Sequence, residues 1–243
     1  MSLVKVSGIV IKQVDFGESN RILTIFTKEM GIINAVLYGA KSKRNKTSGN
    51  CQFLTYADFL LKTGTNDLYT IQSAEPIECF FKIAEDIVKL SLCVYFTDLV
   101  YKLININTPD ENMLRLLLNS VYVLSEDKKS EKLVKAVFEL RAMSYGGYMP
   151  NLACCSECFE SSKPVAFSPK RGGIVCKKCV NAGDYYINSD VYNTLGYIIT
   201  ADEKRIFSFS GSDEVIKTIS KISKDYVLCH CDGTFNSLEY YEK

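Results

Sequence analysis

Two closely spaced cysteine pairs constrain this chain more than any other feature. They lie in "CSECFESSKPVAFSPKRGGIVCKKC", where two residues separate Cys155 from Cys158 and two separate Cys176 from Cys179. The seventeen residues between the pairs, 159–175, match the spacing between the two knuckles of a zinc ribbon. Four thiolates presented in this way predict a tetrahedral metal site with these four cysteines as ligands.

The donor set indicates the role of the metal. Thiolates accept zinc or iron, and a ribbon of this length favours zinc. Four cysteines complete a tetrahedral shell, whereas a catalytic zinc keeps one position open for water, so we expect a structural Zn²⁺. The surrounding segment is rich in Gly, Ser and Lys and should depend on the metal for its folding. Cys154 adjoins the first knuckle and is a weaker alternative ligand.

The other cysteines predict no second framework. The chain has ten cysteines without an export signal, so we expect reduced thiols and interpret Cys51, Cys79 and Cys93 as small core residues. Cys229, His230 and Cys231 are consecutive, and His230 is the only histidine. Successive helical positions point about 100° apart, so these side chains should not converge on one ion or substrate, and we assign them no role.

The first 80 residues are typical of a small antiparallel barrel. Runs rich in Ile, Val, Thr, Tyr and Phe alternate with turn material, without an intervening helix of consequence. Five such strands favour an oligonucleotide-binding (OB) fold, with an SH3-like barrel as the alternative. The expected strands are 4–14, 20–27, 32–40, 56–63 and 67–75.

Helical periodicity begins at Ile83 and predicts an α+β chain of several domains. Expected helices cover 83–103, 110–124, a segment from 130 that Gly146, Gly147 and Pro150 end, 188–202 and 212–231. Asn and Ser caps open the last two. We expect four parts: an OB-fold domain (1–80), the first part of a helical domain (81–150), a zinc-binding insertion (151–184) and the rest of the helical domain (185–243).

A basic stretch follows the third expected strand. In "GAKSKRNKTSGN", residues 39–50, Lys41, Lys43, Arg44 and Lys46 crowd into six positions, although the chain balances 29 Lys and Arg against 28 Asp and Glu. On a barrel that binds oligonucleotides, such a loop can follow a phosphate backbone without reading sequence. Aromatic residues nearby could add base stacking, but each is more often barrel core and we commit none of them: Phe16, Tyr38, Phe53 and Tyr69.

Motifs of common enzymes do not occur in the sequence. GxGxxG, GxxxxGK[ST], GxSxG and the HxE signature of deaminases are all missing, and one histidine leaves little room for histidine catalysis. We therefore expect a binding protein without catalytic residues. The N-terminal apolar stretch is interrupted by Lys5 and Lys12 and is too short for a signal peptide or a membrane span, so we expect a cytoplasmic protein with no membrane contact.

Over almost its whole length the chain resembles the RecO family of bacterial recombination mediators. "GIVIKQVDFGESNRILTIFTKEMGIINAVLYGAKSKRNK" is similar to the family's opening, its (Y/F)GE turn, its LT(L/I)FT strand and its basic GA(R/K) loop. "DLYTIQSAEPIECF" resembles the last barrel strand, and "FELRAMSYGGYMPNLACCSEC" the helix before the first knuckle. "FSPKRGGIVCKKC" is similar to the family's FSP, paired-glycine and second-knuckle pattern.

This resemblance implies non-enzymatic work in DNA repair and homologous recombination, at the nucleoid. It implies binding of single- and double-stranded DNA, strand annealing, and cooperation with RecR to load RecA onto DNA coated by single-strand-binding protein, whose C-terminal tail is a further partner. It carries zinc binding over to Cys155, Cys158, Cys176 and Cys179, and DNA contact to Lys41, Lys43, Arg44 and Lys46. No motif indicates where RecR or the tail docks.

Two other classes stay open. A zinc-stapled adaptor would bind proteins and leave the basic loop incidental, and a DNA titration separates it from a DNA-binding mediator. A thiol oxidoreductase would use one CxxC pair with a lowered thiol pKa. Zinc quantification separates this class from the other two.

Overall fold

The computed structural model describes residues 2–42, 45–64, 68–161 and 163–241. Contacts divide the chain into two compact units that meet in sequence between Ser125 and Glu126. The first unit holds a β-barrel and the helices that follow it, and the second holds the remaining helices and the four-cysteine segment. The finer domain boundaries expected after residues 80, 150 and 184 stay predictions.

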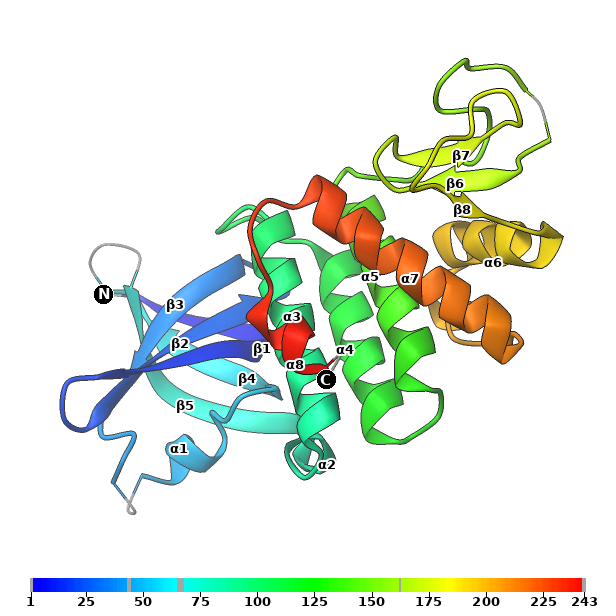
Figure 1. Cartoon of the computed structure of the whole chain (residues 1–243). Helices are drawn as coiled ribbons and strands as arrows, with labels where there is room; N and C mark the ends of the chain where they lie inside the picture. Colours follow the sequence, from blue (N-terminus) through cyan, green and yellow to red (C-terminus); the bar gives the residue numbers. More distant parts are fainter. Residues whose placement is uncertain (1, 43–44, 65–67, 162, 242–243) are drawn as a thin grey trace. The chain divides into compact units, whose positions relative to one another are not determined.

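The N-terminal barrel has the five strands expected from the sequence (Figure 1). They are β1 (Leu3–Phe16), β2 (Asn20–Thr27), β3 (Gly31–Leu37), β4 (Thr55–Lys62) and β5 (Leu68–Cys79). The order β1-β2-β3-β5-β4 is closed by antiparallel pairing of β1 with β4, and β3 pairs with β5 in parallel. A closed five-stranded barrel of this order confirms the predicted OB-like fold.

Alternating side chains fill the interior of the barrel. β4 alternates buried and half-buried positions along its whole length, and its Phe59 and Leu61 lie in the core with Leu23 and Ile33 from the facing strands. A bulge between Val10 and Lys12 bends β1 around the barrel. Each large apolar side chain buried in this way stabilises the fold by about 1.5–3 kcal/mol.

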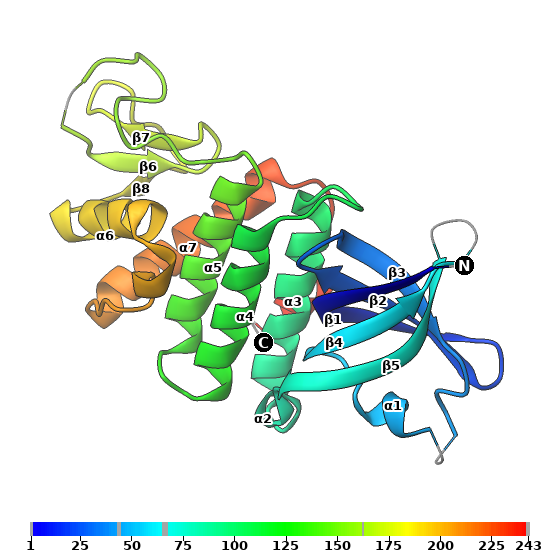
Figure 2. The same cartoon turned by 180° about the vertical axis from the view of Figure 1, so that it is seen from behind.

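The helices of the first unit depart from the sequence expectation at one point. Beyond the short α1 (Lys46–Gly49), they are α2 (Phe81–Ala84), α3 (Ile87–Leu103) and α4 (Glu111–Ser125). The single helix predicted from Ile83 is broken, because the Asp86 carboxylate accepts hydrogen bonds from the N–H groups of Val88 and Lys89 and starts a new helix. Figure 2 shows α3 against the strands, where it contacts β1.

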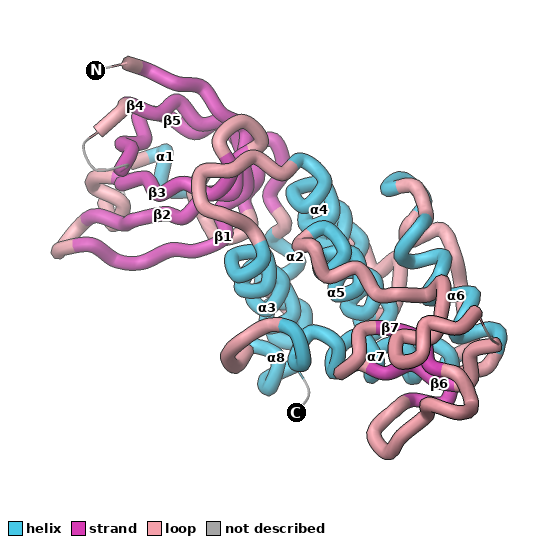
Figure 3. The backbone as a smooth tube through the Cα atoms, turned by 90° about the horizontal axis from the view of Figure 1, so that it is seen from above, coloured by secondary structure: helices cyan, strands magenta, loops and turns pink. Residues whose placement is uncertain are grey.

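The second unit is built on three longer helices that pack on one another, drawn in cyan in Figure 3. They are α5 (Glu131–Tyr145), α6 (Ser189–Thr200) and α7 (Asp213–His230), and the short α8 (Asn236–Tyr241) follows them. The expected caps are present: the Asn188 side chain accepts from the N–H of Val191, and that of Ser212 from the N–H of Val215.

A buried ion pair lies between α5 and α7. The Lys135 ammonium is 2.9 Å from the Glu139 carboxylate, and both side chains are almost fully buried. The hydroxyl of Ser223 on α7 donates to the same carboxylate at 2.5 Å, and Lys135 also donates to the carbonyl of Ser220. Because the charges are desolvated, each depends on its partners, and the network couples the two helices.

The four-cysteine segment lies between α5 and α6 in sequence. Its strands β6 (Ala166–Ser168), β7 (Gly173–Val175) and β8 (Tyr185–Tyr186) form a small sheet in the order β7-β6-β8. Tyr192 of α6 donates to the carbonyl of Leu152, and Tyr226 of α7 donates to that of Tyr148. These bonds attach the segment to the helices.

Candidate metal centre and nucleic-acid interface

The two cysteine pairs come together at one point. The four Sγ atoms of Cys155, Cys158, Cys176 and Cys179 all lie within 4.8 Å of one another, and those of Cys158 and Cys176 are 3.9 Å apart. In each knuckle the chain folds back on its first cysteine: the N–H of Phe159 donates to the carbonyl of Cys155, and the N–H of Cys179 to that of Cys176. The cluster is compatible with a structural metal ion.

The ionisation of the thiols is uneven. Burial raises the pKa of Cys155, but backbone N–H donors from Cys158, Cys176 and Glu157 outweigh it and lower the pKa to about 6. The hydrogen bond with Cys176, together with burial, raises the pKa of Cys179 to about 12. Adjacent thiolates repel one another, so only part of the cluster ionises without a cation. A divalent metal removes that repulsion and favours all four thiolates.

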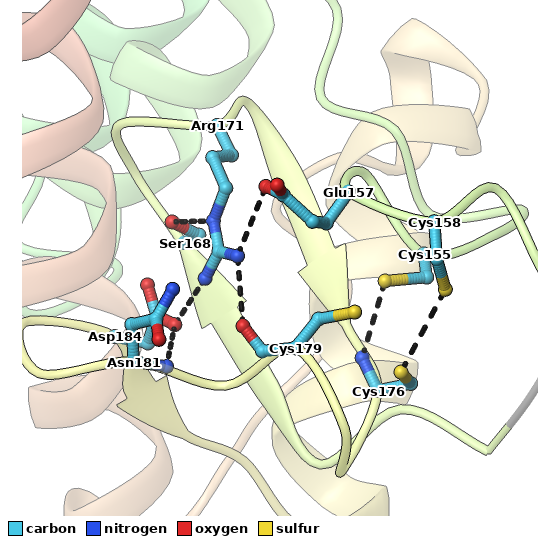
Figure 4. Close-up of polar contacts among 9 residues, drawn as sticks. All are labelled: Cys155, Glu157, Cys158, Ser168, Arg171, Cys176, Cys179, Asn181 and Asp184. Carbon is cyan, nitrogen blue, oxygen red and sulfur yellow. Dashed lines mark hydrogen bonds and ion pairs between the residues drawn. The ribbon is translucent and has the colours of Figure 1, made fainter.

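Arg171 joins the two knuckles from outside the cluster (Figure 4). Its guanidinium donates to the carbonyl of Cys179 at 2.8 Å and to the Ser168 hydroxyl, and it pairs with Glu157 at 3.2 Å and with Asp184. Glu157 belongs to the first knuckle and Cys179 to the second, so one side chain fixes both turns. No sequence motif singled out Arg171.

The remaining cysteines near the chain's C-terminal end have separate surroundings. The His230 Nε2 donates to the carbonyl of Pro169 at 2.9 Å. The Cys229 thiol is exposed, while the Cys231 thiol is buried 3.6 Å from the sulfur of Met143. Within the residues that the structure describes, the one metal-compatible group of His, Cys, Asp and Glu side chains is the four-cysteine cluster.

Two of the three cysteines interpreted as core residues are buried. Cys51 and Cys93 are inaccessible to solvent, and burial raises the pKa of Cys51 to about 12 and that of Cys93 further. Cys79, at the end of β5, is only partly buried. Cys154 keeps its thiol 3.5 Å from the Asn151 amide and is not part of the cluster.

The basic stretch begins at one end of the barrel. The N–H of Lys41 donates to the carbonyl of Ser19 in the β1–β2 turn, which places Lys41 beside that hairpin. Asn45 caps α1 and donates to the carbonyl of Tyr38, and Lys46 is exposed. Lys43 and Arg44, also predicted to contact DNA, lie outside the described residues.

A carboxylate that no sequence motif singled out lies beside the basic stretch. The Asp15 carboxylate is 3.0 Å from the Lys41 ammonium and 3.3 Å from the Arg21 guanidinium. Hydrogen bonds from Lys41 and Arg21 lower the pKa of Asp15, so this carboxylate stays ionised at neutral pH. A phosphate approaching Lys41 therefore competes with Asp15.

The four aromatic residues near the basic stretch divide into two groups. Tyr69 packs against the barrel core and Phe53 is half-buried. Phe16 and Tyr38, by contrast, are 48% and 57% exposed. The two exposed rings lie at the barrel end where the basic stretch begins.

Membrane insertion of a helix is not indicated. Among the described residues, every helix is either too short or too polar to span a bilayer.

Comparison with known proteins places the whole chain in one group. The family model described as Recombination protein O N terminal matches residues 1–80, and Recombination protein O C terminal matches residues 84–239. A DNA repair protein RecO from Acetivibrio thermocellus is 34% identical over 99% of this chain and 96% of its own length. Proteins of the same name from Caldicellulosiruptor saccharolyticus and Alkaliphilus metalliredigens are 32% and 30% identical, each over at least 99% of both chains.

Proposed function

The chain belongs to the RecO family of DNA repair and recombination proteins, and from this premise we propose that it is a DNA-binding recombination mediator without an enzymatic activity. It binds single- and double-stranded DNA and anneals complementary strands. With RecR it loads RecA onto DNA coated by single-strand-binding protein, whose C-terminal tail it also contacts. This work takes place in the cytoplasm, at the nucleoid.

One observation carries the DNA-binding part of this proposal. The basic stretch leaves the barrel beside the β1–β2 turn, with Lys41 attached to Ser19 and Lys46 exposed. OB-fold barrels bind oligonucleotides on the face of strands 2 and 3 and on the adjoining loops, of which the β1–β2 turn is one. The cationic residues of this stretch, Lys41, Lys43, Arg44 and Lys46, are suited to phosphates of any sequence.

Annealing needs no active site under this account. Cationic side chains that neutralise phosphates on two strands reduce their mutual repulsion and raise their local concentration. Base pairing itself then selects the complementary strand. The protein supplies proximity and charge, while the sequence fidelity comes from the DNA.

The ion that we propose for the four-cysteine cluster is Zn²⁺, held by Cys155, Cys158, Cys176 and Cys179. A tetrahedron of thiolates around zinc, with Zn–S of about 2.3 Å, has sulfurs about 3.8 Å apart. The 3.9 Å between the sulfurs of Cys158 and Cys176 fits this value. When bound, the ion would cross-link the two knuckles. It would supply no reaction chemistry, because four cysteines complete its coordination shell.

The proposal is tested by an annealing assay with complementary oligonucleotides, one of them fluorescently labelled. The wild-type protein should accelerate annealing, and the acceleration should weaken as salt rises. Changing Lys41, Lys43, Arg44 and Lys46 together to alanine should remove most of the acceleration. Annealing with unchanged rate and salt dependence in this variant would contradict the role of the basic stretch.

The adaptor alternative makes the opposite prediction. A zinc-stapled protein that binds only other proteins would show no DNA affinity even at low salt and would not accelerate annealing. The same assay therefore separates the two functions.

A further inference from the structure

Two aromatic rings are left exposed at one end of a barrel that fully buries the other phenylalanines of its strands. Phe26 and Phe59 are fully buried, whereas Phe16 and Tyr38 are 48% and 57% exposed. Single exposed apolar residues are common on protein surfaces, but rings that gather at one place indicate a contact surface.

Strand register places these rings close together. Phe16 pairs with Asn20 across β1 and β2, and Arg21 pairs with Leu37 across β2 and β3, so Tyr38 comes opposite Asn20. The Gly39 N–H donates to the Asn20 side chain at 3.0 Å and holds this end of β3 against β2. Phe16 and Tyr38 therefore flank Asn20, about 10 Å apart at two strand spacings.

Both rings lie on the outer face of the sheet. Leu37 belongs to the barrel core, so side-chain alternation turns Tyr38 outward. Gln13 pairs with Leu23 of the core, and Phe16, three positions further along β1, faces the other way. The rings thus occupy the β1–β2–β3 surface.

Positive charge adjoins the two rings. Lys12 is exposed on the same face of β1. Lys41 lies three residues after Tyr38 and is attached to the β1–β2 turn. The surface therefore offers flat apolar rings next to Lys12 and next to Lys41, whose ion pair with Asp15 a phosphate can replace. Proteins that bind single-stranded nucleic acids combine aromatic rings and cations in this way.

We propose that Phe16 and Tyr38 form a base-stacking platform that makes this end of the barrel prefer single-stranded over duplex DNA. The inference rests on the proposed DNA binding and adds to it a preference for single strands. Phosphates are present in both forms, so Lys12 and Lys41 attract either one. Only unpaired bases expose faces on which the rings can stack, because bases in a duplex already stack on one another.

The first test compares three labelled probes of equal length by fluorescence anisotropy: an oligothymidine strand, the corresponding duplex and an abasic strand. In the double variant Phe16→Ala/Tyr38→Ala, affinity for the oligothymidine strand should fall about tenfold or more. Affinity for the duplex and the abasic strand should stay unchanged, as should the salt dependence, because no cation is removed. An equal loss for all three probes, or no loss for any, would overturn the inference.

Control variants separate ring stacking from folding. Tyr38→Phe keeps the ring and should keep wild-type affinity, whereas Tyr38→Leu keeps only apolar area and should lose it. Tyr101→Ala removes an exposed ring from α3 and should change nothing. Loss of affinity in Tyr101→Ala, or retention in Tyr38→Leu, would contradict a stacking role for Tyr38.

A second readout reports stacking directly. The chain contains no tryptophan, so Tyr38→Trp introduces a single tryptophan whose emission can be excited apart from that of the tyrosines. Stacking on a base should quench its emission when the oligothymidine strand is added, and the abasic strand should leave the emission unchanged. The same experiment with Tyr101→Trp should show no quenching. Unchanged emission of Tyr38→Trp at saturating oligothymidine would overturn the inference.

The failure of this inference is distinguishable from failure of the proposed function. If wild-type protein binds no probe at low salt, DNA binding itself is wrong and the platform with it. If binding depends on Lys41, Lys43, Arg44 and Lys46 but not on Phe16 and Tyr38, DNA binding stands and the platform is overturned.

Discussion

The Asp15 carboxylate and the Lys41 ammonium lie 3.0 Å apart, so the first cation of the basic stretch already forms an ion pair within the protein. The pair is exposed on both sides and therefore exchanges readily with solvent ions. DNA binding through Lys41 must replace the Asp15 carboxylate by a phosphate.

Asp15→Asn should strengthen DNA binding. The substitution frees Lys41 and removes a charge that repels phosphate, so affinity for a single strand should rise about two- to fivefold at low salt. Fluorescence anisotropy measures the change. Asp58→Asn is a control for net charge, because the Asp58 side chain, 26% exposed, pairs with Lys5 at 2.9 Å on another part of the barrel. Equal gains in both variants would assign the effect to net charge instead of to Lys41.

Cys158→Ser should lower the zinc content well below one ion per chain, because three thiolates hold zinc less tightly than four. Proteolysis within residues 151–184 should become faster, while the barrel should keep its affinity for DNA. Metal analysis and limited proteolysis measure these effects. Cys154→Ser, next to the first knuckle but outside the cluster, should behave as wild type. Full zinc in Cys158→Ser would show that the metal site is assigned wrongly.

Zinc affinity should fall with decreasing pH, and more steeply below about pH 6. The Cys179 thiol, with its pKa raised to about 12, releases its proton on metal binding throughout the neutral range. The Cys155 thiol, with its pKa lowered to about 6, is already ionised at neutral pH and competes with protons only below that value. Zinc affinity should be measured by competition with a chelator between about pH 5 and pH 8. The slope of log affinity against pH should be larger by about one below pH 6 than above it. A constant slope across pH 6 would contradict this ionisation of Cys155.

Glu139→Ala should destabilise the second unit strongly. It leaves the Lys135 ammonium buried without its carboxylate, at a cost of about 3–5 kcal/mol in the free energy of unfolding. The double variant Lys135→Met/Glu139→Leu removes both charges and should be close to wild type or more stable. Urea unfolding measures both. Glu111→Ala, which breaks the exposed pair with Arg115 at the same helical spacing, should have little effect. A double variant as unstable as Glu139→Ala would contradict the buried-charge explanation.

Local patterns in the sequence predicted much of the fold and the metal cluster. The spacing of the four cysteines is sufficient to identify the cluster, because each knuckle is formed within four residues. Runs rich in β-branched and aromatic residues, separated by turn material, predicted the five strands, and Asn188 and Ser212 predicted two helix starts. The break before α3 was missed because the cap at Asp86 competes with a continuous apolar period.

Contacts between distant residues explain what the sequence did not reveal. The Arg171 guanidinium binds Glu157, Cys179 and Asp184, which come from three separate turns. The exposure of Phe16 and Tyr38 depends on register across three strands, since alternation alone does not say which face meets solvent. The pairing of Asp15 with Lys41 likewise exists only after the β1–β2 hairpin meets the loop after β3.

The most direct test of DNA binding by the basic stretch is the salt dependence of single-strand affinity. Anisotropy of a labelled oligonucleotide should be titrated at several salt concentrations with the wild type and with Lys41, Lys43, Arg44 and Lys46 changed to alanine. A control changes four exposed lysines of the cysteine segment: Lys163, Lys170, Lys177 and Lys178.

Each phosphate contact contributes about 0.7 to the slope of log affinity against log salt on single strands. The variant of the basic stretch should therefore have a slope shallower by about 2 to 3, while the control keeps the wild-type slope. Equal slopes in the wild type and the basic-stretch variant would contradict the assignment of these four residues to DNA.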